Sequence, residues 1–169
     1  MANRVNSDLV RKAIEQIDRE RMVKMTMDLT NIPSPTGYEG DMARAVNDLL
    51  KGAGFDSVLQ PIGDERYNAV GRLQGKGGGK SLMFNGHLDT SFGPEQAHRG
   101  IGYKCEGTLV DNEWIYGMGS FNMKSAMATY ITASDAIRKA GIKLGGDVVI
   151  AGVAGEIEKS PVNDYEGRQ

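Results

Sequence analysis

The sequence predicts an α/β fold in which helices cover a sheet. Amphipathic helical patterns and short strand-like segments follow one another in the order helix, helix, strands, helix, strand. The last segment, residues 147–153, is a continuous apolar run, which is typical of a strand buried on both faces. The length of 169 residues is enough for one domain with its own hydrophobic core.

Two helical patterns open the chain. Apolar residues recur at helical spacing over residues 10–29, and they predict one long helix that starts at Asn6 or Ser7. This helix should end before residues 31–37, because each of the two prolines in this segment disfavours helix in the residue that precedes it. A second helix is expected over residues 39–51, where glycines follow as stop signals.

Strand character follows in four short segments, which are residues 57–60, 68–73, 81–85 and 113–116. The glycine-rich residues 75–79 lie between the second and third of them, and they predict a hairpin turn that pairs these two strands.

A long helical pattern then covers residues 122–140. Its apolar positions lie on one face, and Gly141 is its expected end. The buried strand over residues 147–153 comes next, so this helix is expected to cover the sheet.

The composition excludes several classes of protein. Twenty basic and 22 acidic residues give a net charge of −2, which argues against a nucleic-acid or polyphosphate-binding surface. No apolar run approaches the ~20 residues that span a bilayer, which argues against a membrane protein. Cys105 is the single cysteine, so no intramolecular disulfide forms. With no signal-peptide pattern at the start, a cytoplasmic location is expected.

Two glycine-rich segments nearly match nucleotide-binding motifs. Residues 74–81 resemble a phosphate-binding loop, but Gln74 replaces the first glycine and a strand rather than a helix follows. Residues 117–122 resemble a dinucleotide fingerprint, but Asn122 replaces its third glycine. A nucleotide-binding domain is therefore the weakest of the functional interpretations.

Residues 84–90 carry the first group suited to chemistry. His87 and Asp89 come where a strand ends, and side chains two residues apart in a strand project to the same side. A carboxylate beside a histidine fixes its tautomer and raises its basicity as a metal ligand. A structural histidine bonded to its neighbour is the equally open alternative.

Two further segments carry polar groups at suitable places. Asn122 stands at the start of the long helix, where it could cap the helix or offer an amide oxygen to a metal. Glu156 and Glu158 follow the buried strand, where carboxylates suit metal binding or general-base catalysis. Two solvated loop glutamates are the alternative interpretation.

Taken together, these segments resemble the M20 family of metallopeptidases, the group of acetylornithine deacetylase and succinyl-diaminopimelate desuccinylase. Residues 85–90 (NGHLDT), 117–124 (GMGSFNMK) and 155–158 (GEIE) look like its two metal motifs and its glutamate motif. Residues 32–40 and 54–56 look like family landmarks upstream. The resemblance implies a three-layer-type sheet flanked by helices, the N-terminal part of a zinc-peptidase-like catalytic domain. Residues 1–169 would then form a partial domain that lacks the lid and the C-terminal half.

The resemblance also implies a role for each matching residue. His87 would be a metal ligand, Asp89 its orienting carboxylate, and Glu156 the general base. Asn122 falls where the family has a metal-bridging aspartate, and its neutral amide should hold two ions less well. Ile157 falls where the family has a second glutamate, so Glu158 is the candidate for that ligand role.

The function expected from this resemblance is metal-dependent hydrolysis of the N-acyl bond of an N-acylated amino acid or small peptide. The family site holds two ions, here zinc, with cobalt or manganese as alternatives. The resemblance implies a homodimer of the full-length protein, and an inactive isolated chain because further ligands lie in the part that is missing. The alternative is a non-catalytic scaffold or binding domain, which Asn122 and Ile157 favour.

Overall fold

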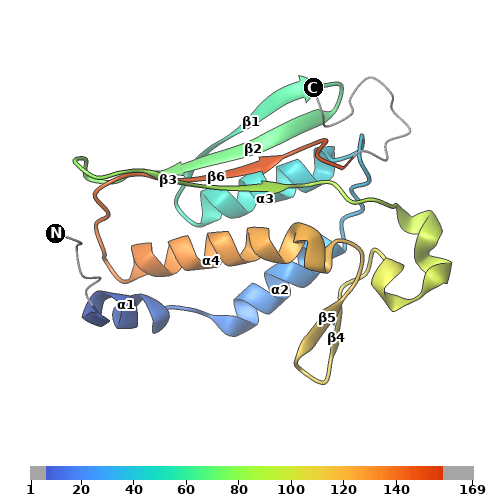
Figure 1. Cartoon of the computed structure of the whole chain (residues 1–169), viewed down its shortest axis with the longest axis horizontal. Coiled ribbons are helices and arrows are strands. Elements are labelled where there is room, and N and C mark those ends of the chain that lie inside the picture. Colours follow the sequence, from blue (N-terminus) through green and yellow to red (C-terminus); the bar gives the residue numbers. More distant parts are fainter. Residues whose placement is uncertain (1–6, 158–169) are drawn as a thin grey trace.

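The computed structural model describes residues 7–157 (Figure 1). Its centre is a four-stranded sheet in the order β1-β2-β6-β3. The β1–β2 and β2–β6 pairs are antiparallel, and the β3–β6 pair is parallel. The strands are β1 (Asp56–Gly63), β2 (Arg66–Leu73), β3 (Leu82–His87) and β6 (Val148–Val153). The buried strand predicted near the end of the chain is confirmed as β6, which has a neighbour on each side.

The helices form two layers beside this sheet. The sheet is covered by α3 (Gly40–Gly52) and α4 (Ser125–Lys139), which contact each other. The outer layer, α1 (Ser7–Ile14) and α2 (Arg19–Thr30), packs against α4 (Figure 1). The predicted α/β fold with a sheet flanked by helices is therefore confirmed. None of the described helices is long and apolar enough to cross a membrane.

The core lies between the sheet and the helices α3 and α4. The rings of Phe84 on β3 and Tyr130 on α4 stack with their centroids 4.7 Å apart. Gly71 on β2 faces α3, and a Cβ added there would lie 3.2 Å from the Leu50 side chain. The missing side chain of Gly71 lets α3 pack closely on the sheet. The apolar face predicted for residues 39–51 is therefore the face that contacts the sheet.

The prediction of one long helix at the start of the chain is wrong, because this part of the chain forms two helices, α1 and α2. Asp18 ends the link between them and caps α2, accepting a hydrogen bond from the Arg21 amide at 2.9 Å. A side-chain cap satisfies an amide that the first turn of a helix leaves free, so it favours a new start at that point. Ser7 is the first residue of α1, and Asn6 lies outside the described residues.

The prediction that residues 75–79 form a hairpin turn between two paired strands is also wrong. Strand β6 lies between β2 and β3, so these two strands do not pair. The glycine-rich run instead packs against residues 144–146, where the Gly79 amide donates to the Gly145 carbonyl at 3.1 Å. A Cβ on Gly79 would lie 2.7 Å from the Gly145 backbone. The glycines serve close backbone approach rather than a hairpin turn.

A small ribbon precedes α4. It consists of β4 (Thr108–Val110) and β5 (Trp114–Tyr116), joined by a turn in which Asp111 and Asn112 have φ values of +51° and +56°. Two successive positive φ values are the pattern of a type I′ hairpin turn. The expected strand at 113–116 is confirmed, while β4 was missed because three residues carry little alternation. Two short 3₁₀ turns, Pro94–Arg99 and Ile101–Tyr103, come before the ribbon.

One buried acid links the two helical layers. Asp135 on α4 is 2% exposed, and its carboxylate binds Arg21 of α2 at 2.6 Å, Arg138 at 2.7 Å and Lys139 at 3.0 Å. Burial alone raises the pKa of the Asp135 carboxyl, but the three cations outweigh it and hold this pKa below the ordinary 3.8.

We expect Asp135→Asn to lower the free energy of unfolding at pH 7 by about 1.5–3 kcal/mol, the usual contribution of hydrogen bonds to a charged group. Because the folded-state pKa of Asp135 is lowered, its stabilisation is present above about pH 4 and is lost as the pH falls through the folded value. Urea unfolding at pH 7 and at pH 3 measures both effects. The control is Asp28→Asn, which breaks an exposed pair with Lys24 and should cost less than about 0.5 kcal/mol.

Candidate active site

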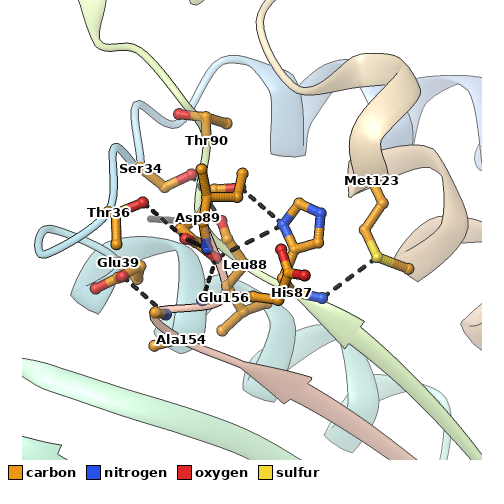
Figure 2. A network of polar contacts seen from close by, with 12 residues as sticks. Ser34, Thr36, Glu39, His87, Leu88, Asp89, Thr90, Met123, Ala154 and Glu156 are labelled. Atoms are coloured by element: carbon orange, nitrogen blue, oxygen red, sulfur yellow. Dashed lines mark hydrogen bonds and ion pairs between the residues drawn. The ribbon is translucent and has the colours of Figure 1, made fainter. Parts of the chain in front are cut away.

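The candidate site lies where β3 and β6 end side by side. These strands run parallel, and His87 at the end of β3 is opposite Val153 at the end of β6. The carboxyl ends of parallel strands are where open α/β sheets bind their ligands. Figure 2 shows the side chains of His87, Asp89 and Glu156 gathered at this edge. Four of the predicted site residues are thus brought together, because Asn122 also reaches His87.

His87 is held at both ring nitrogens and is 6% exposed. Its Nδ1 lies 2.9 Å from the backbone oxygen of Asp89, and its Nε2 lies 2.9 Å from Oδ1 of Asn122. A carbonyl oxygen only accepts hydrogen bonds, so Nδ1 carries the proton. In the neutral ring, the lone pair of Nε2 then faces the lone pairs of the Asn122 oxygen.

Two facing acceptors need a hydrogen-bond donor or a cation between them. A metal ion, a second proton on His87, or an Asn122 amide turned to present its NH₂ group would each satisfy the pair. Two ligand atoms about 2.0–2.2 Å from one ion lie about 3.3–3.6 Å apart at a tetrahedral angle and about 3 Å apart at a right angle. The 2.9 Å between His87 and Asn122 is the length of a direct hydrogen bond, and a small opening of the pair would give the separation of two ligands of one ion.

Among the described residues, His87 and Asn122 are the candidate metal ligands that lie in contact with each other. Within residues 7–157, no group of three or more His, Cys, Asp and Glu side chains could hold a metal ion. Glu158, the third predicted ligand, lies outside the described residues. Glu156 precedes it and is exposed, so its carboxylate is open to solvent at this edge.

The carboxylate of Asp89 binds the neighbouring loops rather than the ring of His87. Its Oδ1 lies 3.6 Å from Nδ1 of His87, farther than the hydrogen bond that the Asp89 backbone oxygen makes. Its two oxygens accept from the Thr36 hydroxyl at 2.7 Å and from the amides of Glu156 and Ile157 at 3.3 and 2.7 Å. Asp89 thus orients the histidine through its backbone and ties the segment of Glu156 to the end of β3.

Asn122 is not the cap of the long helix, which starts at Ser125 rather than at the predicted 122. Its backbone is extended, with φ −127° and ψ 96°. Lys124 anchors this turn, since its amide donates to Gly119 and its ammonium donates to the Ile32 carbonyl at 2.6 Å. Burial lowers the pKa of Lys124 to about 8.

Met123 touches the strand that carries His87. Its sulfur accepts a hydrogen bond from the His87 amide at 3.3 Å. This approach requires Gly86, because a Cβ at that position would lie 2.6 Å from the Met123 methyl group. The turn before α4 is therefore pressed against the end of β3, and Asn122 is held next to the imidazole.

The polar residues of the segment before α3 were not predicted to belong to the site, although residues 32–40 resemble a family landmark. Ser34 donates to the Leu88 carbonyl at 2.8 Å, and residue 35 pairs with Thr90, so this segment runs beside the end of β3. Thr36 and Glu39 then reach the loops after β3 and β6. Their position before an amphipathic helix suggested only a helix start. The sequence shows Glu39 only as an acidic residue at the start of a helical pattern, and the structure shows that its side chain does not cap that helix.

Comparisons with known proteins agree with this arrangement. Residues 83–160 match the family model described as peptidase family M20/M25/M40. A succinyl-diaminopimelate desuccinylase of Dinoroseobacter shibae is 33% identical over 112 residues, which are 66% of this chain and 29% of that protein. The N-formyl-4-amino-5-aminomethyl-2-methylpyrimidine deformylase of Bacillus subtilis is 28% identical over 158 residues, 87% of this chain and 35% of the relative. The chain therefore spans about a third of the length of these relatives.

Solved structures show the same fold. The di-peptidase Dug1p of Saccharomyces cerevisiae matches with a TM-score of 0.70 and 16% identity, over 89% of this chain and 34% of that chain. Human carnosine dipeptidase 1 matches with a TM-score of 0.69 and 19% identity, over 88% and 34% of the two chains. The described sheet and helices thus correspond to about a third of each of these larger proteins.

Proposed function

Because this chain belongs to peptidase family M20/M25/M40, we propose that the intact protein is a metal-dependent hydrolase that cleaves an amide bond. Its substrate on this proposal is an N-acylated amino acid or a small peptide, since the printed names of its relatives include a desuccinylase and a deformylase. The observation that carries the proposal is the approach of the Asn122 amide to His87 Nε2 at 2.9 Å, at the edge where Glu156 also lies.

On this proposal, His87 and Asn122 hold an ion that polarises the scissile carbonyl when it is bound. The Asp89 backbone oxygen keeps the proton on Nδ1, which would leave the lone pair of Nε2 available to hold an ion. The Glu156 carboxylate takes a proton from the attacking water and delivers it to the nitrogen of the leaving amine. One amide and one water thereby give one carboxylic acid and one amine.

The ligand types suit zinc, with cobalt or manganese as alternatives, and the family relationship supports a site for two ions. Glu158 is the proposed further ligand from this chain. The lid, the remaining ligands and a homodimer interface would lie outside the described residues, in which case residues 7–157 alone would be inactive.

Hydrolysis of N-succinyl and N-acetyl amino acids by the intact protein, with and without added zinc, tests the proposal. We expect turnover that a chelator removes and zinc restores. Activity that is unchanged after complete metal removal, verified by elemental analysis, would exclude metal-dependent chemistry.

A second candidate is a non-catalytic scaffold or binding domain of the same fold. Asn122 and Ile157 favour it, because a neutral amide and an aliphatic side chain stand where the family resemblance places two carboxylates. Metal content separates the two candidates. About two tightly bound divalent ions per intact protomer would reject the scaffold, and a protein that binds none would support it.

We expect Asn122→Asp to raise the affinity of the intact protein for a second zinc ion by about tenfold or more. A carboxylate at the proposed metal-bridging position adds a negative charge to the ligands that both ions would share. Calorimetric titration of the metal-free protein with zinc measures this affinity. The control is Asn85→Asp, which places the same charge at an exposed position two residues before His87. Equal changes in both variants would show that the effect is general charge attraction rather than ligation.

A further inference from the structure

The segment that carries Glu156 is held by side chains from three other parts of the chain. Residues 154–157, called here the glutamate loop, follow β6 directly. The Ala154 amide donates to Asn68 Oδ1 at 3.0 Å, and the Gly155 amide donates to Glu39 Oε1 at 3.1 Å. The next two amides both donate to the Asp89 carboxylate. Each amide of the loop is therefore bound by a side-chain oxygen.

Glu39, like Asp89, is fully buried. Its side chain is 0% exposed, and it forms a bidentate ion pair with Arg66, in which both nitrogen–oxygen distances are 2.8 Å. Its Oε1 also accepts from the Gly37 amide at 2.9 Å. Arg66 begins β2, so one carboxylate joins the segment before α3, the start of β2 and the glutamate loop.

From these contacts we propose that Glu39, fixed by Arg66, is a positioning residue for Glu156, an inference that rests on the function proposed above. The Glu156 side chain is exposed, so neighbouring side chains do not pack it into place. The position of the Glu156 side chain is therefore set by the backbone of the glutamate loop. Glu39 accepts a hydrogen bond from the backbone amide of Gly155, the residue before Glu156, and Figure 2 shows Glu39 beside this loop. Displacements of about 1 Å at a reacting group can lower a rate by about 100-fold.

Two double variants separate this positioning role from the stability of the ion pair. Both carry Arg66→Met, so neither retains the buried positive charge. Glu39→Gln keeps an oxygen that can accept from Gly155, whereas Glu39→Ala removes it. The two proteins therefore differ in the buried side-chain oxygen that can accept from the Gly37 and Gly155 amides, and in the volume of that side chain.

We expect the Glu39→Ala/Arg66→Met protein to have a kcat about 10- to 100-fold below that of Glu39→Gln/Arg66→Met, with KM and zinc content nearly unchanged. Rates are expressed per folded protein. Asp135→Asn serves as the control for general destabilisation, because it removes a buried acid that binds cations of α2 and α4 rather than the loop, and it should leave kcat unchanged. Equal kcat values in the two double variants would overturn the positioning role.

Amide hydrogen exchange gives a readout that does not depend on activity. We expect exchange at residues 155–157 to be about tenfold faster in the Glu39→Ala/Arg66→Met protein than in the Gln variant, because the loop opens locally. Unchanged exchange would overturn the proposal whatever the kinetics show. If the unsubstituted protein hydrolyses no amide, the proposed function fails while this exchange difference still reports on the loop.

Discussion

Replacing His87 by alanine is expected to lower kcat/KM for hydrolysis by about 1,000-fold or more in the intact protein. A bound ion contributes several kcal/mol of charge stabilisation to the transition state, and each 1.36 kcal/mol changes the rate tenfold. His87 is the one imidazole at the described edge, and its Nε2 faces Asn122 at 2.9 Å. Loss of the ring should also lower bound zinc, measured by elemental analysis after dialysis.

The chain offers a matched control, since it has only one other histidine. His98 is exposed and lies in a short 3₁₀ turn, where its Nδ1 contacts the Glu95 backbone oxygen. We expect His98→Ala to keep activity and zinc content within about twofold of the unsubstituted protein, as for a surface substitution away from the site. A His87→Ala protein that folds, binds zinc normally and retains activity would remove His87 from the site.

Glu39→Ala alone is expected to be the most destabilising single substitution discussed here, by about 3–5 kcal/mol. It leaves the guanidinium of Arg66, which is 3% exposed, without its carboxylate partner. Denaturant unfolding at pH 7 measures the change. Adding Arg66→Met should recover part of the loss, because it removes the buried charge that has lost its Glu39 partner.

The neighbouring surface pair provides the comparison. Arg44 binds Glu65, and these side chains are 40% and 79% exposed. Glu65→Ala should change the free energy of unfolding by less than about 1 kcal/mol, because water solvates the separated charges. Similar losses from Glu39→Ala and Glu65→Ala would mean that burial does not set the strength of the Glu39–Arg66 pair.

Features with a local cause were predictable from the sequence. The helix predicted over residues 39–51 corresponds to α3, with a shift of one residue at each end. It was predictable because its apolar spacing and its glycine stop signals lie within one short segment of the sequence. The run of apolar residues after Asp147 identified β6 for the same reason. The ends of β3 and β6 were predictable too, because polar residues follow their apolar residues in the sequence. These ends indicated the sheet edge at which His87 and Glu156 lie.

Features that depend on distant segments were not predictable in this way. Strand order is one of them, because nothing within residues 75–79 shows that β6 will occupy the place beside β2. Glu39 is another, since its partners Arg66 and Gly155 are 27 and 116 residues away along the chain. The capping role of Asp18 was local but was hidden by apolar residues that continue the helical spacing on both sides of it.

The place of β6 in the sheet has a consequence for how the molecule forms. As the last described strand to be synthesised, it is the one that joins β3 to the β1–β2 hairpin. Until it arrives, β3 has no strand neighbour among the described elements, and the many long-range pairings must wait for late loop closure. We expect assembly of the sheet and of the His87–Glu156 edge to be a single late event in folding. A nascent chain that ends before residue 148 would expose two strand edges, which are sites for association with other chains.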